Sequence, residues 1–137
     1  MTATTLKPQA MNSATRLKSK VISATRDLTA VTGDVAYTGV GFTPTSLIAS
    51  ADLSTKKSWT LGFADSAKAG QGHYLTDVPQ SGPLSDVGAT VIIFAQSAAN
   101  NYQYAIVKSY DADGFTLTWT KVNSPTGTAT IRFLCFS

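Results

Sequence analysis

The feature that most constrains the fold is a series of short apolar or alternating segments, separated by clusters of turn residues, from about residue 21 onward. Such segments are typical of β-strands, and the stretches between them are too short for crossover helices. We therefore predict nine strands that pair mainly antiparallel. The predicted strands are residues 21–28, 34–40, 46–51, 58–63, 73–78, 89–96, 102–110, 115–122 and 128–136.

Two of these strands also indicate which side chains are buried. Large apolar residues and threonines alternate over residues 115–120, so one face packs against the core and the other meets water or a neighbouring subunit. We call that second side the threonine face; it consists of Thr116, Thr118 and Thr120. In the last strand, Leu134 and Phe136 make both faces apolar, and we expect this end to be buried on both sides.

Composition favours the same fold class. The chain contains 20 Thr, 14 Ser and 10 Gly but no Glu, and all eight acidic residues are Asp. Thr suits a pleated surface, Asp and Gly suit turns, and Glu favours helices. A length of 137 residues, 43% of them hydrophobic, fits one domain with a buried core. We predict an all-β protein: a jelly-roll-like antiparallel β-sandwich over residues 19–137, preceded by an extended N-terminal arm over residues 1–18.

The positive charge is concentrated in and just after the predicted arm. Residues 1–26 contain five basic and no acidic residues, a net charge of +5, whereas residues 27–137 contain six basic and eight acidic residues, a net charge of −2. We expect this segment to bind an acidic protein surface, with a solvated tail as one alternative. Binding to nucleic acid is another alternative, disfavoured because no aromatic residues interleave with the charges. The basic residues are Lys7, Arg16, Lys18, Lys20 and Arg26, and the candidate apolar anchors are Met11 and Leu17.

Residues for catalysis and metal binding are scarce. His73 is the one histidine, Cys135 is the one cysteine, and no serine lies in a Gly-x-Ser-x-Gly motif. A Ser-His-Asp triad or a zinc site of His and Cys is therefore not expected, nor is a cofactor. No apolar run of seven residues occurs among the first twenty, so we expect folding inside the cell. No membrane-spanning segment is predicted.

Three further motifs each have an ordinary structural explanation. Asp111-Ala-Asp113-Gly114 is similar to the start of a calcium loop, but later ligands are missing, and a hairpin turn with Gly114 at positive φ explains it. Residues 39–41 and 70–72 are glycine-rich, yet neither segment opens a helix, which favours turns over phosphate binding. The aromatic residues Trp59, Tyr102, Tyr104, Tyr110 and Trp119 are candidates for a glycan-binding groove or, alternatively, for packing between strands.

Two segments resemble a known family module. The stretches GDVAYTGVGFTPTSLI (residues 33–48) and DADGFTLTWTKVNSPTGTATIRF (residues 111–133) are similar to a β-domain of tailed-bacteriophage virion proteins. This module occurs in small capsid decoration (cement) proteins and in tail-fibre-like chains. The short arm and the absence of a repetitive shaft favour a decoration protein. The resemblance implies a compact β-sandwich at junctions between capsomers, with the major capsid protein and neighbouring copies as partners.

The resemblance also implies where the protein acts. We expect synthesis in the host cytoplasm and a final location on the capsid surface of the virion. The basic residues and apolar anchors named above would dock on the capsid, while the threonine face, Leu134 and Phe136 would mediate self-association at a symmetry axis. Two alternatives are open: a tail-fibre or receptor-binding tip that contacts a host glycan or protein, and an enzyme fragment. The enzyme is disfavoured by the lone histidine and the lack of Glu, although Asp111 and Asp113 form a carboxylate pair.

Overall fold

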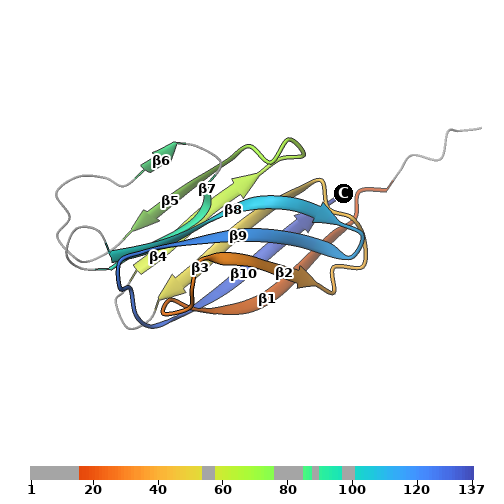
Figure 1. Cartoon of the computed structure of the whole chain (residues 1–137). Coiled ribbons are helices and arrows are strands. Elements are labelled where there is room, and N and C mark those ends of the chain that lie inside the picture. Colours follow the sequence, from red (N-terminus) through yellow and green to blue (C-terminus); the bar gives the residue numbers. More distant parts are fainter. Residues whose placement is uncertain (1–15, 54–57, 76–84, 88–89, 97–100) are drawn as a thin grey trace, which may run out of the picture.

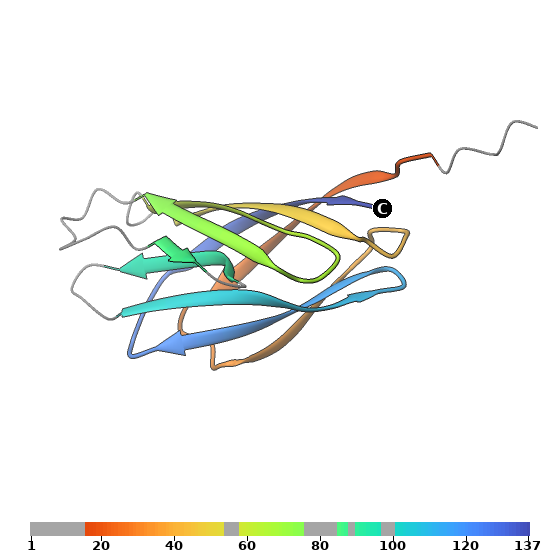
Figure 2. The same ribbon diagram turned by 90° about the horizontal axis from the view of Figure 1, so that it is seen from above.

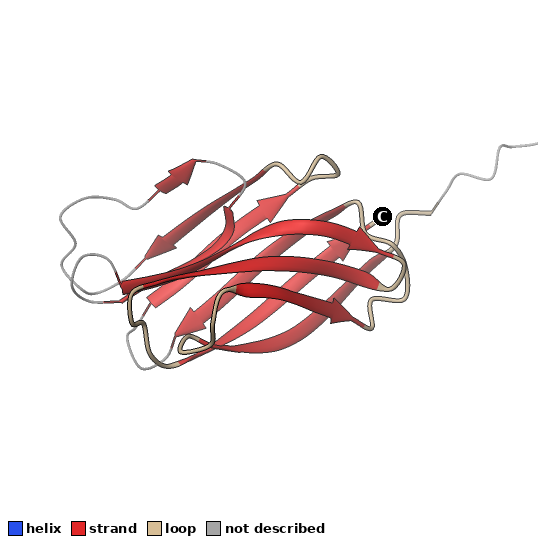
Figure 3. Cartoon of the chain, viewed as in Figure 1, coloured by secondary structure: helices blue, strands red, loops and turns tan. Residues whose placement is uncertain are grey.

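The structure is a computed structural model that describes residues 16–53, 58–75, 85–87, 90–96 and 101–137 (Figure 1). Within these ranges every regular element is a β-strand (Figure 3). The strands are β1 (Ser19–Asp27), β2 (Gly33–Thr38), β3 (Ser46–Leu53), β4 (Ser58–Ala64), β5 (Gly70–Leu75), β6 (Ser85–Val87), β7 (Thr90–Gln96), β8 (Asn101–Asp111), β9 (Gly114–Val122) and β10 (Thr128–Phe136).

The strands form two antiparallel sheets that face each other as two layers (Figure 2). The larger sheet has the order β1-β10-β3-β4-β5-β6, and the smaller sheet has the order β2-β9-β8-β7. The predicted antiparallel β-sandwich is thus confirmed, and each of the nine predicted strands corresponds to a strand of the structure. The prediction missed the three-residue strand β6. Strands β3 to β6 and β7 to β9 run as simple meanders, while β2 belongs to the smaller sheet although β1 and β3, its neighbours in sequence, belong to the larger one.

The core lies between the two sheets and contains a cluster of aromatic side chains. The ring of Tyr37 lies 5.3 Å from that of Phe115 and 4.9 Å from that of Phe133, and the latter two rings are 4.8 Å apart. Phe115, Phe133 and the nearby Trp119 are fully buried. Such offset and edge-on ring pairs add to the stabilisation from apolar burial.

The first described residues lie beside the C-terminus. The backbone N–H of Ser137 donates a hydrogen bond to the carbonyl of Lys18 over 3.1 Å, and Ser19 of β1 pairs with Phe136 of β10. Residues 16–18 and the end of β10 therefore share one end of the sandwich (Figure 1).

Candidate functional site

The outer face of the larger sheet carries most of the exposed apolar surface in the described part of the chain. Seven large hydrophobic side chains are exposed among the described residues, and five of them lie on this face with exposed fractions between 39% and 56%: Val21, Ile48, Trp59, Leu61 and Phe63. Leu134 and Phe136 of β10 are half-buried on the same side. We call this surface the apolar face; its members are Val21, Ile48, Trp59, Leu61, Phe63, Leu134 and Phe136.

The strand register makes the apolar face continuous. Val21 of β1 is paired with Leu134 of β10, and Leu134 is paired in turn with Ile48 of β3. Ile48 is then paired with Phe63 of β4, so one apolar row crosses four neighbouring strands. Side chains paired in this way have Cβ atoms about 5 Å apart and contact one another. Leu61 extends the row along β4.

Strand β4 buries its small residues and exposes its large apolar ones, whereas an ordinary half-buried strand buries the large apolar residues. It buries Ser58, Thr60, Gly62 and Ala64 and exposes its three large residues. The cause is the close approach of the opposite sheet: a Cβ atom added to Gly62 would lie 2.0 Å from the carbonyl oxygen of Val91 in β7. Only small inward residues fit here, so the large ones project outward. Alternation in the sequence identifies this strand but not which of its faces is buried.

Two charged side chains lie within the apolar face. Arg132 of β10 is exposed and is paired with Ser50 of β3, while the half-buried Asp52 of β3 is paired with Trp59 of β4. The indole N–H of Trp59 donates to the Ser50 hydroxyl over 3.3 Å, which holds the ring against the sheet. The face therefore presents a mostly apolar surface with one cation and one anion on adjacent strands.

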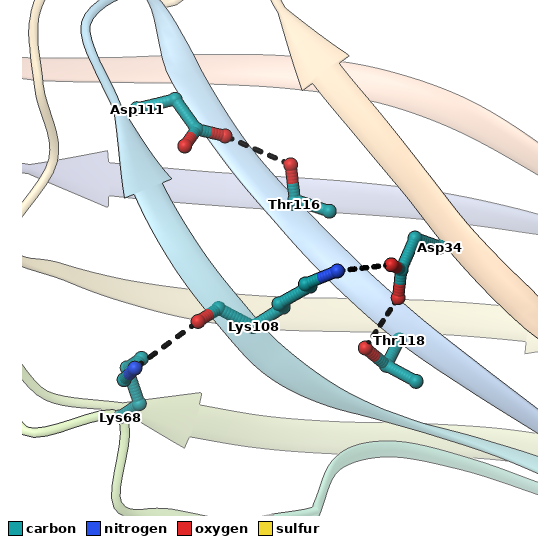
Figure 4. A network of polar contacts seen from close by, with 6 residues as sticks. All are labelled: Asp34, Lys68, Lys108, Asp111, Thr116 and Thr118. Carbon is teal, nitrogen blue, oxygen red and sulfur yellow. Dashed lines mark hydrogen bonds and ion pairs between the residues drawn. The ribbon is translucent and has the colours of Figure 1, made fainter.

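The outer face of the smaller sheet is polar by contrast (Figure 4). Lys108 forms an ion pair with Asp34, and the Thr118 hydroxyl donates to the other oxygen of that carboxylate over 2.6 Å. The hydrogen bond from Lys108, followed by that from Thr118, lowers the pKa of Asp34. Thr116 donates to Asp111 over 2.8 Å. Two residues of the threonine face are thus engaged within the molecule.

This arrangement separates two features that we expected to act together. The threonine face lies outside the smaller sheet, whereas Leu134 and Phe136 lie outside the larger one. A single self-association surface cannot contain both. Phe136 and Leu134 are also half-buried rather than buried on both sides, because no further layer of the described chain covers the apolar face.

The residues proposed for docking have different locations. Arg16, Leu17 and Lys18 are exposed immediately before β1, and Lys20 is exposed at its start; we refer to this region as the start of β1. Lys7 and Met11 lie outside the described residues. The expectation that Arg26 docks on a partner surface is wrong, because this side chain is buried.

Arg26 is a core residue with an exposed fraction of 9%. Its Nε donates to the side-chain oxygen of Gln103 over 3.0 Å, its Nη2 donates to the carbonyl of Val31 over 3.0 Å, and its guanidinium lies 4.8 Å from the centre of the Trp119 ring. Burial lowers its pKa. The sequence contains a signal for this position, because Arg26 is in phase with the inward-facing Ala24.

The fully buried Gln103 completes this network. Its amide nitrogen donates to the carbonyls of Leu28 and Ala30, both over 2.8 Å, which fixes the turn between β1 and β2 to the smaller sheet. Trp119 donates to the Tyr37 hydroxyl over 3.1 Å. The polar groups of Arg26, Gln103, Trp119 and Tyr37 are therefore engaged with buried partners, which is typical of a structural network in a core.

The Asp-Ala-Asp-Gly motif is a hairpin turn that also holds a neighbouring loop. Asp113 accepts hydrogen bonds from the backbone N–H groups of Gly41 over 2.6 Å and Gly39 over 3.0 Å, which lower its pKa. Gly114 has a nearly extended φ of 159°, and a Cβ there would lie 1.9 Å from the Tyr37 carbonyl oxygen, so close approach is what requires glycine. Among the described residues no group of three His, Cys, Asp or Glu side chains could hold a metal.

The aromatic residues considered for glycan binding do not share one surface. Trp119 is in the core and Trp59 is on the apolar face. Tyr102 and Tyr104 stack on each other with ring centres 6.1 Å apart on β8, and the Tyr110 hydroxyl donates to the carbonyl of Ala64 over 3.2 Å. These contacts are those of strand packing.

Comparison of the chain with protein-family models, curated proteins and solved structures yields no match. In the described ranges, no helix has the length and apolar character required to cross a membrane.

Proposed function

We propose that this chain is a structural protein, not an enzyme, that binds the outside of a phage capsid and stabilises the shell. The resemblance of residues 33–48 and 111–133 to a virion module suggests the setting. The observation that carries the proposal is that two different exposed surfaces, the basic residues at the start of β1 and the apolar face, adjoin each other at Lys20 and Val21. A protein that cements a shell must contact more than one partner, and two separate surfaces suit that task.

The first contact surface is the basic start of β1. Arg16, Lys18 and Lys20 are exposed, and Lys18 is hydrogen-bonded to Ser137 at the end of the sandwich. No acidic residue occurs before Asp27 in the sequence. Clustered, exposed cations of this kind accelerate and orient binding to an acidic surface.

The second contact surface is the apolar face, whose row begins at Val21, one residue after Lys20. A contiguous apolar patch rimmed by polar residues is typical of a protein–protein interface. Binding that favours the assembled shell over its dissociated subunits adds its free energy to the stability of the shell. Many copies with modest affinity are sufficient for this effect.

The proposal is tested by mixing the purified protein with phage capsids that lack it, sedimenting the shells and counting bound copies per shell. We expect saturable binding at a fixed ratio to the major capsid protein, together with a higher melting temperature of the shell. Absence of binding would refute the capsid role.

A matched pair of variants tests the basic surface in the same assay. The double variant Lys18→Ala/Lys20→Ala should bind more weakly and with a smaller dependence on salt. The control Lys68→Ala/Lys108→Ala removes the same number of charges from residues outside this surface and should bind like the wild type. Equal loss in both variants would contradict docking through the start of β1.

A further inference from the structure

We infer that the apolar face is the contact between two copies of this chain, packed face to face about a two-fold axis. The inference rests on the proposed function in one respect: of the two contact surfaces proposed there, it assigns the apolar face to a second copy of the chain. The basic start of β1 is then left for the shell. Independent support for the dimer comes from the extent, the shape and the charges of the apolar face.

The extent of the face suits a dimer of moderate stability. Its five exposed side chains present on the order of 400 Å² of apolar surface, which lies in the range of functional patches on single chains. Two such faces in contact bury about twice that area from these residues alone. The half-buried Leu134 and Phe136 and the serines and threonines between them bring the total to about 1,000 Å², the lower bound for a specific interface.

The shape of the face also suits a copy of itself. The row from Val21 through Leu134 and Ile48 to Phe63 spans four adjacent strands of one sheet. Two sheets with the same twist pack face to face about 10 Å apart, and their side chains interdigitate. This is the packing that already joins the two sheets inside the sandwich.

The charges on the face are complementary to those of a second copy. Arg132 and Asp52 lie on adjacent strands at diagonal positions, because Arg132 is paired with Ser50 and Asp52 with Thr130. Neither side chain has an ion-pair partner within the described part of the molecule. We consider a two-fold axis that lies in the plane of the interface and passes between the positions of Arg132 and Asp52. About this axis, each Arg132 faces the Asp52 of the other copy. The pair forms twice, and no charge is left unmatched.

The rest of the molecule is compatible with this pairing. The polar network of Asp34, Lys108 and Thr118 is on the opposite side and stays in water. A dimer also carries two basic chain starts. Linked binding sites engage a shared surface with higher avidity than a single site does.

The experiment is sedimentation equilibrium of the full chain without capsids, over a concentration series. We expect a monomer–dimer equilibrium for the wild type. The Leu61→Asp variant should remain monomeric, because it places a carboxylate in the centre of the face, and circular dichroism checks that it folds. The control Val31→Asp alters a residue that is 80% exposed and lies outside the face, and it should dimerise like the wild type.

Charge reversal provides the decisive comparison. Arg132→Asp and Asp52→Arg should each weaken dimerisation at least tenfold, because each brings like charges together. The double variant Arg132→Asp/Asp52→Arg should restore it. A wild type that stays monomeric at all concentrations, or a double variant no better than the single ones, would overturn the inference. If the protein is strictly monomeric but binds capsids, the dimer is refuted and the proposed function stands. If the protein dimerises but does not bind capsids, the proposed function is refuted and the dimer stands.

Discussion

Gly62 of β4 and Val91 of β7 lie so close together that a Cβ atom on residue 62 would be 2.0 Å from the carbonyl oxygen of residue 91. The two sheets therefore approach each other closely at the strand that exposes Trp59, Leu61 and Phe63. The outward position of these large side chains follows from the lack of space on the inner side. The apolar face is in this sense a product of the packing inside the sandwich.

The close approach makes Gly62 intolerant of even a methyl group. Gly62→Ala should lower the free energy of unfolding by about 2 kcal/mol, because the backbone of β7 has to move. Chemical denaturation of the purified variant measures this change. Gly72→Ala is the matched control, since a Cβ there would be 3.4 Å from the nearest atom, the Thr90 carbonyl oxygen. A loss as large in the control would contradict the explanation.

The buried network should depend strongly on Gln103. Gln103→Ala leaves the Nε of Arg26 and the carbonyls of Leu28 and Ala30 without their partner. Buried groups that lose their hydrogen bonds destabilise the fold, and we expect a loss of about 3 kcal/mol in the free energy of unfolding. Thr120→Ala, on the outer surface of the smaller sheet, should change stability by less than about 0.5 kcal/mol. Similar losses for both variants would argue against the network.

Asp113 should make stability depend on pH in the acid range. Hydrogen bonds from Gly41 and Gly39 lower its pKa in the folded state. The stabilisation is therefore complete above the pKa of the unfolded chain, about 4, and is lost as the pH falls through the lower pKa of the folded state. Asp113→Asn should be less stable than the wild type at pH 7, and the difference should shrink below pH 4. A difference that does not change with pH would contradict this role.

Cys135 should be unreactive until the sandwich opens. Its side chain is fully buried on β10, and burial raises the pKa of the thiol to about 11. Thiolate is the reactive form, so thiol reagents at pH 7 should label the folded protein far more slowly than the protein in denaturant. The labelling rate is followed by mass spectrometry. Equally fast labelling under both conditions would show that β10 is not protected.

The fold was largely predictable from the sequence because its signals are local. Strand β9 alternates apolar residues with threonines, and the turn at Asp111–Gly114 ends the strand before it. The order of the strands was not predictable, since the pairing of Ser19 with Phe136 joins residues more than a hundred positions apart. A three-residue strand such as β6 is also too short to give a periodic pattern.

The candidate site was less predictable than the fold. Which face of β4 is buried depends on Val91, a residue of the other sheet, and no pattern within residues 58–64 contains that information. Arg26 was assigned to the surface because of its charge, although its phase within β1 agrees with burial. Leu134 and Phe136 were identified as surface candidates, but their neighbours Val21, Ile48 and Phe63 became apparent only from the register.

The position of β10 has a consequence for how the protein is made. The last strand along the chain lies between β1 and β3. The larger sheet therefore cannot assemble until residues 128–136 have left the ribosome, and β1 must wait for a partner synthesised about a hundred residues later. Such distant pairings slow folding and leave strand edges open in the meantime. A premature stop near residue 128 would remove β10 and leave β1 without a partner in its sheet, whereas in most domains the final residues can fray without harm.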